Sequence, residues 1–353
     1  MKFVELLYNT LPIQSKVKLN QSVVDILQDA LGVSVILADG SVEQGDIVVA
    51  SDGVHSYTRE LMYKHANNQN SAKKLATTLQ SRYKCLFGIS SLPSGQTAGD
   101  MVETHYKNMC IQLLCQAEHV FWFLFVKLET PTTVKVNYTE EEALAFAKQY
   151  MDTPVTSSTS FRDLWQKGYR FTLANLEEGV QKQWHSGRIV LLGDAAHKMT
   201  PNLAFGFNNA LESAASLTNH LHKLLESSSI PTENSISAVF KAYQTQRFSR
   251  AKFSHDLTAF YTSFAAWENS LMKWASIITP KILPETFPVD QLAKLVKGAV
   301  KLEFLEVPER ELGTVAFDDE VETKYASSMA IAWIGGLLAV LVTGVLWSGI
   351  GSS

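Results

Sequence analysis

The sequence is poor in cysteine, has no excess of basic residues and begins without a long hydrophobic run. Its 353 residues include three cysteines, Cys85, Cys110 and Cys115, and no CxxC pair, which argues against a disulfide framework and a zinc site. Lys and Arg number 31 against 35 Asp and Glu, a net charge of −4, whereas nucleic-acid-binding proteins normally carry a basic surplus. The first residues, MKFVELLYNT, do not resemble a signal peptide. We therefore expect neither a nucleic-acid partner nor a bound metal.

One long hydrophobic run lies near the end of the chain. Met329 to Trp347 holds about 19 apolar or small residues, close to the 20 that a helix needs to cross a bilayer. The alternative is a buried core helix, but charge-free runs of this length favour a membrane span. Lys324 precedes the run, and no Lys or Arg follows it. This pattern predicts a single-pass C-terminal anchor, in the endoplasmic reticulum membrane, with the body of the protein in the cytosol.

The rest of the chain predicts a folded protein with both helices and strands. Hydrophobic residues make up 46% and charged residues 19%, enough to form a sizeable core. The expected strands are Val33–Leu37, Ile47–Ala50, Tyr83–Ser90, Phe121–Val126 and Ile189–Leu192, and Asp39-Gly40 signals a hairpin turn after the first of them. The expected helices are Leu6–Ile13, Val23–Leu31, Glu140–Tyr150, Asn208–Glu226 and Ile236–Lys252, with Thr139 as the expected N-cap of the third. The aromatic-rich stretch Phe253–Ile278 is interpreted as a cover on a hydrophobic cavity or as a membrane-facing surface.

Two of these strands end in an Asp beside a Gly, in the segments IVVASDGVHS and IVLLGDAAHKMTPN. In α/β sheets, ligands bind beyond the carboxyl ends of the strands. Glycine allows the backbone to approach a ligand closely, and Asp accepts hydrogen bonds from sugar hydroxyls. The second segment also opens a long helix, whose first N–H groups favour a negatively charged group. Each pair by itself fits a simple turn, but together they indicate a nucleotide cofactor.

These two segments resemble a known family. GDIVVASDGVHSYTRE is similar to the "DG" motif, and GRIVLLGDAAHKMTPN to the "GD" motif, of the FAD-dependent aromatic-hydroxylase-like monooxygenases. HKMTPN and the hydrophobic C-terminal run resemble its fungal branch, which epoxidises or hydroxylates terpenoid, meroterpenoid and indole-diterpene intermediates. The resemblance implies FAD as cofactor, NADPH as reductant, a small hydrophobic substrate and other enzymes of a biosynthetic pathway as partners.

The resemblance also assigns roles to residues of both segments. Asp194 is expected to hold ribityl or ribose hydroxyls of FAD, while the segment from Pro201 through Gly206 to Phe207 passes along the flavin ring. Asp52 and Gly53 are expected near the pyrophosphate and the nicotinamide donor, and Arg59 is expected to order that loop.

Catalytic side chains are harder to identify. Arg82 and Tyr106 lie in the segment that resembles the substrate-facing layer of these enzymes, where Tyr can donate a proton and Arg can orient a substrate or NADPH. Both residues also fit a purely structural role in a sheet. His197 is interpreted as a loop-ordering residue without chemistry, and the three cysteines as core residues.

The sequence departs from the family pattern in two places. The family opens with a βαβ unit that carries a GxGxxG turn, and no such turn occurs in the sequence, so about a hundred residues are expected to be absent. Without that unit, the strands Ile47–Ala50 and Ile189–Leu192 are expected to expose unpaired edges and apolar faces. Phe205 and Phe207 stand where the family has smaller or polar residues, so Phe207 is expected to crowd the ring or cover a cavity.

The expected fold class is α/β (α+β), an incomplete FAD-binding Rossmann-like domain with a mixed β-sheet substrate domain and a C-terminal transmembrane helix. The expected boundaries are 1–65 and 181–250 for the FAD-binding parts, 66–180 for the sheet, 251–328 for a helical region and 329–350 for the membrane helix. Three hypotheses remain open: a membrane-anchored FAD monooxygenase, a non-catalytic remnant or accessory protein that holds no FAD, and a split enzyme. For the chain by itself we expect little or no bound flavin.

Overall fold

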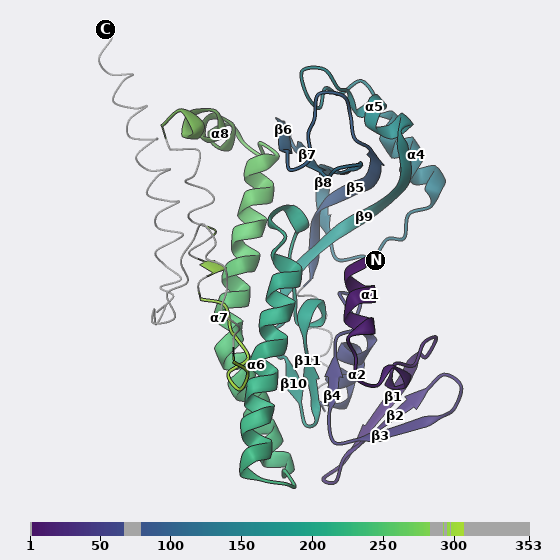
Figure 1. Cartoon of the computed structure of the whole chain (residues 1–353), viewed down its shortest axis with the longest axis vertical. Helices are drawn as coiled ribbons and strands as arrows, with labels where there is room; N and C mark the ends of the chain where they lie inside the picture. Colours follow the sequence, from purple (N-terminus) through teal and green to yellow (C-terminus); the bar gives the residue numbers. More distant parts are fainter. Residues whose placement is uncertain (1, 67–78, 283–291, 293–294, 297, 307–353) are drawn as a thin grey trace.

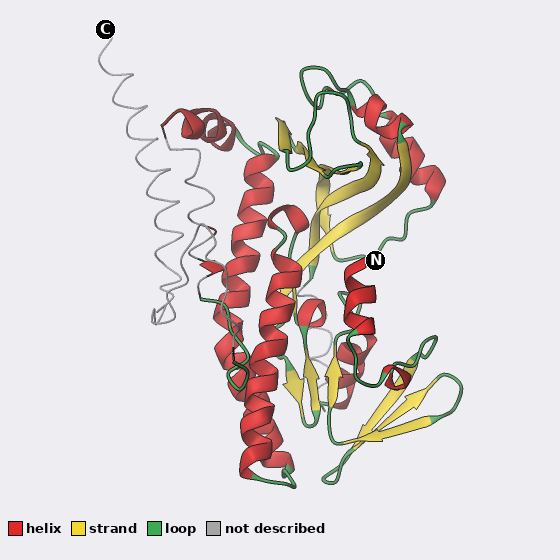
Figure 2. Ribbon diagram, in the orientation of Figure 1, coloured by secondary structure: helices red, strands yellow, loops and turns green. Residues whose placement is uncertain are grey.

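The computed structural model describes residues 2–66, 79–282, 292, 295–296 and 298–306. A large twisted sheet lies at one end, and two long helices run from it along a small three-stranded sheet at the other end (Figure 1). A separate antiparallel sheet flanks the small one (Figure 2). This arrangement is a mixed α/β fold, as expected from the sequence.

The small sheet contains the two strands that end in Asp-Gly and Gly-Asp. Strand β4 (Val48–Ala50) pairs in parallel with β11 (Ile189–Leu191), and β10 (His185–Ser186) pairs antiparallel with the other edge of β11. Both apolar runs predicted to be strands are confirmed, and the structure shows that they pair with each other in parallel. Because Leu191 is the register partner of Ala50, the two strands end at the same level and their loops leave side by side.

The prediction that both strands expose edges and apolar faces is wrong for β11. Its residues Ile189, Val190 and Leu191 are all fully buried, because β10 covers one edge and β4 the other. Phe240 and Tyr243 belong to the same core cluster and cover the strand from a neighbouring helix. Strand β4 differs, since Val49 is 41% exposed and the strand has one neighbour within the described part of the chain.

The large sheet has six strands in the order β12-β9-β5-β8-β7-β6. Their bounds are β5 (Gln80–Ser91), β6 (Met101–Tyr106), β7 (Met109–Cys115), β8 (His119–Thr132), β9 (Gly168–Val180) and β12 (His197–Lys198). One face packs on α4 (Glu140–Lys148) and α5 (Phe161–Gln166) through Trp122, which is fully buried. Thr139 caps α4 as predicted, and Glu142 completes a capping box.

Two long helices connect the sheets. Helix α6 (Phe205–Ser227) follows the Gly-Asp loop, and α7 (Glu233–Ala265) returns beside it (Figure 1). The stretch from Phe253, predicted to be a cover, continues α7 without a break to Ala265 and is followed by α8 (Ser270–Ile282). Continuation is favoured because no Pro or Gly interrupts residues 253–265, and because Tyr261 and Ala265 pack on the large sheet.

The helix predicted over Val23–Leu31 is wrong. Val23–Gln28 forms β1, which pairs with β2 (Val33–Leu37), and β2 pairs with β3 (Val42–Gly45) across the predicted Asp39-Gly40 turn. The apolar positions of β1 fit both helical and strand spacing, and pairing with β2 decides in favour of the strand. Ahead of this sheet lie α1 (Lys2–Asn9) and a short 3₁₀ turn, and α2 (Tyr57–His65) follows β4.

The predicted membrane helix at Met329–Trp347 lies outside the described residues. Among those described, none of the helices combines the length and apolar character that a bilayer crossing requires.

Candidate functional site

The loop after β11 is held close to the start of α6. Gly193 has a φ of +62°, and a Cβ there would lie 3.3 Å from the Cβ of Ala210 on α6. Left-handed backbone at this closeness favours glycine. Asp194 follows, and a Cβ on Gly206 would lie 4.0 Å from its Oδ1. The Asp194 carboxylate predicted from the sequence therefore lies beside the first turn of α6.

The N-terminus of α6 has no side-chain cap. Its N-cap residue, Ala204, has a φ of +54° and provides no hydroxyl or carboxylate, and the first turn contains no acidic residue. The first N–H groups of a helix have no partner within the helix, so a 23-residue helix presents partial positive charge here. Pro201, in the 3₁₀ turn Pro201–Leu203 just before it, sets the entry of the chain. The electron-rich end of a flavin ring fits such a helix end.

Asp194 is paired with a basic residue in the described structure. Lys198 Nζ donates to Asp194 Oδ2 at 2.6 Å, and about a third of each side chain is exposed, 29% and 33%. The second oxygen, Oδ1, faces Gly206. The accessible carboxylate can accept hydrogen bonds from sugar hydroxyls, and the uncapped N–H groups beside it can donate to a negatively charged ring edge. A flavin with its ribityl chain requires both kinds of group.

The loop after β4 is ordered by its own side chains. Asp52 accepts hydrogen bonds from the Ser56 hydroxyl and, at 2.9 Å, from the backbone N–H of Thr58. Ser56 in turn caps α2 by accepting from the N–H of Arg59 at 3.0 Å. Gly53 has a φ of +85° and open space around its Cβ position. Asp52 thus shapes the loop, while its expected place near the pyrophosphate stays a prediction.

Arg59 joins the two loops. It is 7% exposed, and its Nη1 donates to the carbonyl of Ala195 at 2.9 Å while Nη2 donates to Val54 at 2.8 Å. Burial lowers the pKa of Arg59, with Tyr63 and Asp52 acting in the opposite direction. The expected role of Arg59 in ordering the loop is confirmed, and the structure extends it to the Gly-Asp loop.

A buried polar network lies behind the Gly-Asp loop. His197 is fully buried, with Nε2 2.9 Å from the Ser213 hydroxyl, and burial followed by the nearby Arg247 lowers its pKa to about 4. Arg247 Nη1 donates to Glu212 at 2.6 Å and Nη2 to Asn209 Oδ1 at 3.1 Å. His197 is thus a neutral residue that orders the loop. Sequence reasoning missed Arg247 and Glu212, because no local motif surrounds them.

The loop that leads into α6 also contacts the large sheet. Gln112 Nε2, from β7, donates to the carbonyl of Asn202 at 3.3 Å, and Thr262 of α7 donates to Asn202 Oδ1 at 2.9 Å. Sequence reasoning missed Gln112, although a single polar residue in the apolar run MCIQLLC is a signal for such a contact. These contacts fix the loop around Asn202, which leads into α6, relative to the large sheet.

An aromatic surface lies on this face of the sheet. Phe87 and Phe123 are half-buried with ring centroids 6.4 Å apart, and Phe123 stacks on Phe125 at 6.1 Å. Next to them is a hollow of about 230 Å³ lined by Phe121, Arg170 and neighbouring residues. Trp122, by contrast, points into the core on the opposite face.

The two catalytic candidates are not brought together. Arg82 Nε donates to Glu178 on the neighbouring strand at 2.6 Å, and its other nitrogens lie against α7. Tyr106 lies at the end of edge strand β6, where its hydroxyl donates to the carbonyl of Pro154 at 2.6 Å. Both residues have structural partners, and their catalytic roles stay predictions.

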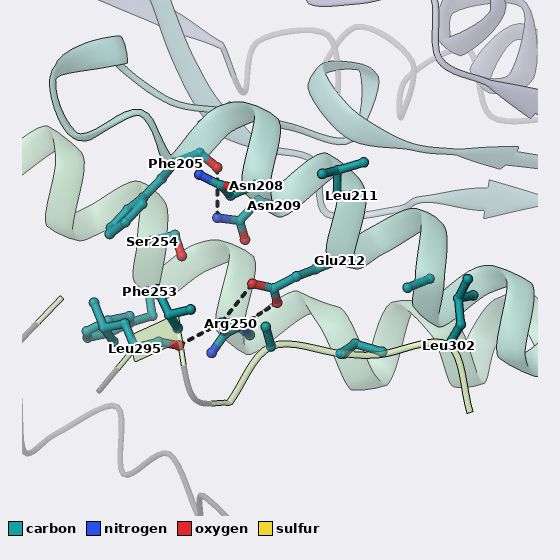
Figure 3. A pocket seen from close by; sticks show the side chains of 14 residues that line it. Phe205, Asn208, Asn209, Leu211, Glu212, Arg250, Phe253, Ser254, Leu295 and Leu302 are labelled. Atoms are coloured by element: carbon teal, nitrogen blue, oxygen red, sulfur yellow. Dashed lines mark hydrogen bonds and ion pairs between the residues drawn. The ribbon is translucent and has the colours of Figure 1, made fainter. Parts of the chain in front are cut away.

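Phe207 does not fill a closed cavity in the described structure. It is 52% exposed, and its ring packs edge-to-face on Phe3 of α1 with centroids 5.2 Å apart. A larger hollow, about 390 Å³, lies between α6, α7 and residues 295–296 and 299–302. There Arg250 connects Glu212 to the carbonyl of Leu295 (Figure 3). Of the segment Pro201–Phe207, which is expected from the sequence to pass along the flavin ring, Phe205 lines this hollow.

The sequence is similar to a known protein family and to fungal monooxygenases. A family model described as "FAD binding domain" matches residues 12–252. The FAD-dependent monooxygenase ausM of Emericella nidulans is 31% identical over 321 residues, which cover 88% of this chain and 66% of that protein. The FAD-dependent monooxygenase prhF of Penicillium brasilianum is 36% identical over 272 residues, covering 73% of this chain and 56% of that protein. The chain thus spans less than two thirds of the first of these relatives and little more than half of the second.

Solved structures share the fold at low sequence identity. Klebsiella pneumoniae HpxO in complex with FAD and uric acid has a TM-score of 0.60 at 19% identity, over 80% of this chain and 68% of that one. A salicylate hydroxylase substrate complex has a TM-score of 0.57 at 19% identity, over 82% and 69%. With the family match over residues 12–252, these findings show that the chain belongs to the FAD binding domain family, alongside fungal FAD-dependent monooxygenases.

Proposed function

We propose that this chain acts in FAD-dependent monooxygenation, in which a terpenoid-type intermediate of fungal secondary metabolism is epoxidised or hydroxylated with NADPH and O₂. The observation that carries the proposal is the Arg59 contact to Ala195, which holds the two strand-end loops together beside the uncapped N-terminus of α6. The fungal monooxygenases that the chain resembles support the reaction class.

Different residues of the site contact the cofactor and position the loops around it. Asp194 accepts hydrogen bonds from hydroxyls of the ribityl chain, and the first N–H groups of α6 stabilise negative charge on the reduced ring. Arg59 fixes the loop that carries Asp194, and Gln112 fixes the loop before α6 to the sheet. FAD, when bound by these residues, would supply the activation of O₂ and the transfer of an oxygen atom to the substrate.

The aromatic surface of the large sheet is suited to a hydrophobic substrate. Phe87 and Phe123 offer apolar area, and Arg170 and Thr172 add polar groups at the rim of the hollow. An apolar wall with few polar groups is the usual composition of a small-molecule site. Because Gln112 joins this sheet to the loop at Asn202, a substrate lying on the aromatic surface is held near the cofactor.

The test begins with added FAD, because little flavin is expected to remain on the chain during purification. We expect the purified full chain to quench the fluorescence of FAD, and anaerobic NADPH to bleach the absorbance of the bound flavin. Phe123→Ala is expected to leave FAD binding unchanged while weakening the effect of a terpenoid substrate on the rate of bleaching. Absence of any FAD binding would overturn the proposal and favour the non-catalytic accessory role.

We also propose that the C-terminal hydrophobic run anchors the protein in a membrane. Residues 329–347 are long enough to span a bilayer and contain no charged residue. Deleting residues 329–353 is expected to move the protein from the membrane fraction to the supernatant after carbonate extraction. Unchanged membrane association would contradict the anchor and direct attention to the aromatic residues of α7 and α8.

A further inference from the structure

A mixed cluster of potential metal ligands lies outside the flavin site, on the edge of the large sheet. His105 of β6 and Cys110 of β7 are register partners, and Glu103 is two residues from His105 on the same face of β6. One ligand atom from each residue lies within 4.8 Å of the others. The cluster is covered by the C-terminal part of α7, which ends beside β6 (Figure 1).

The histidine is oriented as a ligand. Its Nδ1 lies 2.8 Å from the carbonyl oxygen of Ala265, and a carbonyl only accepts, so Nδ1 carries the proton. In the neutral ring, Nε2 then has a free lone pair, and this atom lies 3.8 Å from Glu103 Oε2. Metal-bound histidines characteristically donate their other N–H to a carbonyl or carboxylate. Stacking on Trp267, with centroids 5.8 Å apart, further fixes the ring.

The glutamate has one oxygen satisfied and one available. Tyr261 donates its hydroxyl to Glu103 Oε2 at 2.7 Å. Oε1 is buried and receives no N–H or O–H hydrogen bond from the residues that the structure describes, and the donor beside the carboxylate is the weak S–H group of Cys110. A buried carboxylate oxygen with only so weak a donor is costly, so its presence points to a ligand that the protein atoms do not supply.

The cysteine completes the set. Cys110 is fully buried and is the register partner of His105, so its Sγ lies in the same cluster of ligand atoms. We propose that Glu103 Oε1, His105 Nε2 and Cys110 Sγ bind one zinc ion. Zinc accepts oxygen, nitrogen and sulfur ligands together in tetrahedral sites, and three protein ligands leave the fourth position for water.

A zinc ion at this place would attach the end of α7 to the sheet edge. Ala265 and Tyr261, both on α7, hold two of the ligands, and Gln112 is the register partner of Glu103. Gln112 also contacts the carbonyl of Asn202 in the loop before α6. The ion would therefore be bound by β6 and by β7, the strand that contacts this loop. Cysteine spacing could not indicate this site, since it uses one cysteine and residues of two strands.

The test measures metal binding directly. The full chain, with its affinity tag removed and after treatment with a chelator, is dialysed against Zn²⁺ and, separately, against Co²⁺. We expect one zinc per chain, and with cobalt a thiolate-to-cobalt band together with visible bands of a tetrahedral ion beyond the flavin absorption. Absence of the thiolate-to-cobalt band in the folded wild-type protein would overturn the proposal.

Variants locate the site. Cys110→Ser and His105→Gln are each expected to weaken zinc binding by about 100-fold or more, and Tyr261→Phe, which removes only the bond to Glu103, by about 10-fold. Cys85→Ser removes another fully buried cysteine and His119→Gln an exposed histidine, and both are expected to bind zinc as the wild type does. If Cys110→Ser and Cys85→Ser behave alike in the folded state, the assignment is wrong. If Cys110→Ser does not fold, the wild-type cobalt spectrum and the zinc affinity of Tyr261→Phe still test whether the cluster binds the metal.

Discussion

Arg59 Nη1 donates to the carbonyl oxygen of Ala195 at 2.9 Å, across 136 residues of sequence. The contact joins the loops at the ends of the two parallel strands, both of which are expected from the sequence to contact the cofactor. Since Arg59 is buried, its guanidinium exchanges hydration for hydrogen bonds to the carbonyl oxygens of Ala195 and Val54. The geometry of the site therefore depends on one buried cation.

Replacing Arg59 by Leu should lower the free energy of unfolding by about 2 to 4 kcal/mol, because two carbonyl groups lose a charged donor. Urea denaturation followed by circular dichroism measures the change. Arg162→Leu is the matched control, since Arg162 and its partner Asp152 are both exposed and such pairs contribute about 0 to 1 kcal/mol. Equal losses of unfolding free energy in the two variants would show that the Arg59 bridge stabilises the protein no more than an exposed ion pair does.

Asp194→Asn should weaken FAD binding by about 10-fold to 100-fold, because hydrogen bonds to a charged acceptor contribute about 1.5 to 3 kcal/mol. Flavin fluorescence quenching gives the affinity. Asp163→Asn serves as control, because its carboxylate accepts from Ser160 at the start of helix α5, which packs on the large sheet. If the Asp194 variant binds FAD like the wild type, the carboxylate does not contact the cofactor.

Much of this site could be predicted from the sequence because its signals are local. The runs Ile47–Ala50 and Ile189–Leu192 are short and continuously apolar, and each ends in Asp and Gly, so strand type and loop position follow from adjacent residues. The capping of α4 by Thr139 is local in the same way. Helix α6 begins at Phe205, three residues before the predicted start, because Ala204 turns the chain in the left-handed region.

Other features depended on contacts between distant residues. Residues 23–28 carry apolar positions compatible with helix or strand, and only pairing with β2 selects the strand. Gln112, Arg247 and the Glu103–Cys110 cluster acquire their partners from other elements, so no local spacing reveals them. The sequence therefore located the cofactor loops, whereas the elements that hold those loops in place required the structure.

Gly193→Ala should destabilise the protein more than Gly40→Ala. Both glycines have positive φ, +62° and +82°, so each substitution carries the backbone penalty of about 1 kcal/mol. At Gly193 a methyl group would also lie 3.3 Å from Ala210, whereas Gly40 has open space. Thermal unfolding of the two variants compares them directly. Equal decreases in melting temperature would mean that the Gly193 loop can move away from α6 without any loss of stability.

The stability of the protein should fall as the pH decreases from about 6.5 to 4, because His197 is buried as a neutral ring with a pKa of about 4. In that window the unfolded chain binds a proton at this residue and the folded chain does not, so acid favours unfolding. The expected slope is about 1.4 kcal/mol per pH unit, with stability rising with pH and levelling off above the unfolded pKa. His185, whose pKa burial also lowers, adds to the same trend.

His197→Gln isolates this contribution. The variant removes the titrating ring while it retains a polar group near the Ser213 hydroxyl, so it should lose stability at pH 7 yet depend less steeply on pH below 6.5. Urea denaturation at pH 7, 6 and 5 gives both quantities. His119→Gln, on an exposed strand end, should retain the slope of the wild type. A wild-type slope in His197→Gln would show that other groups cause the acid sensitivity, because a residue that titrates only in the unfolded state must change the slope when it is removed.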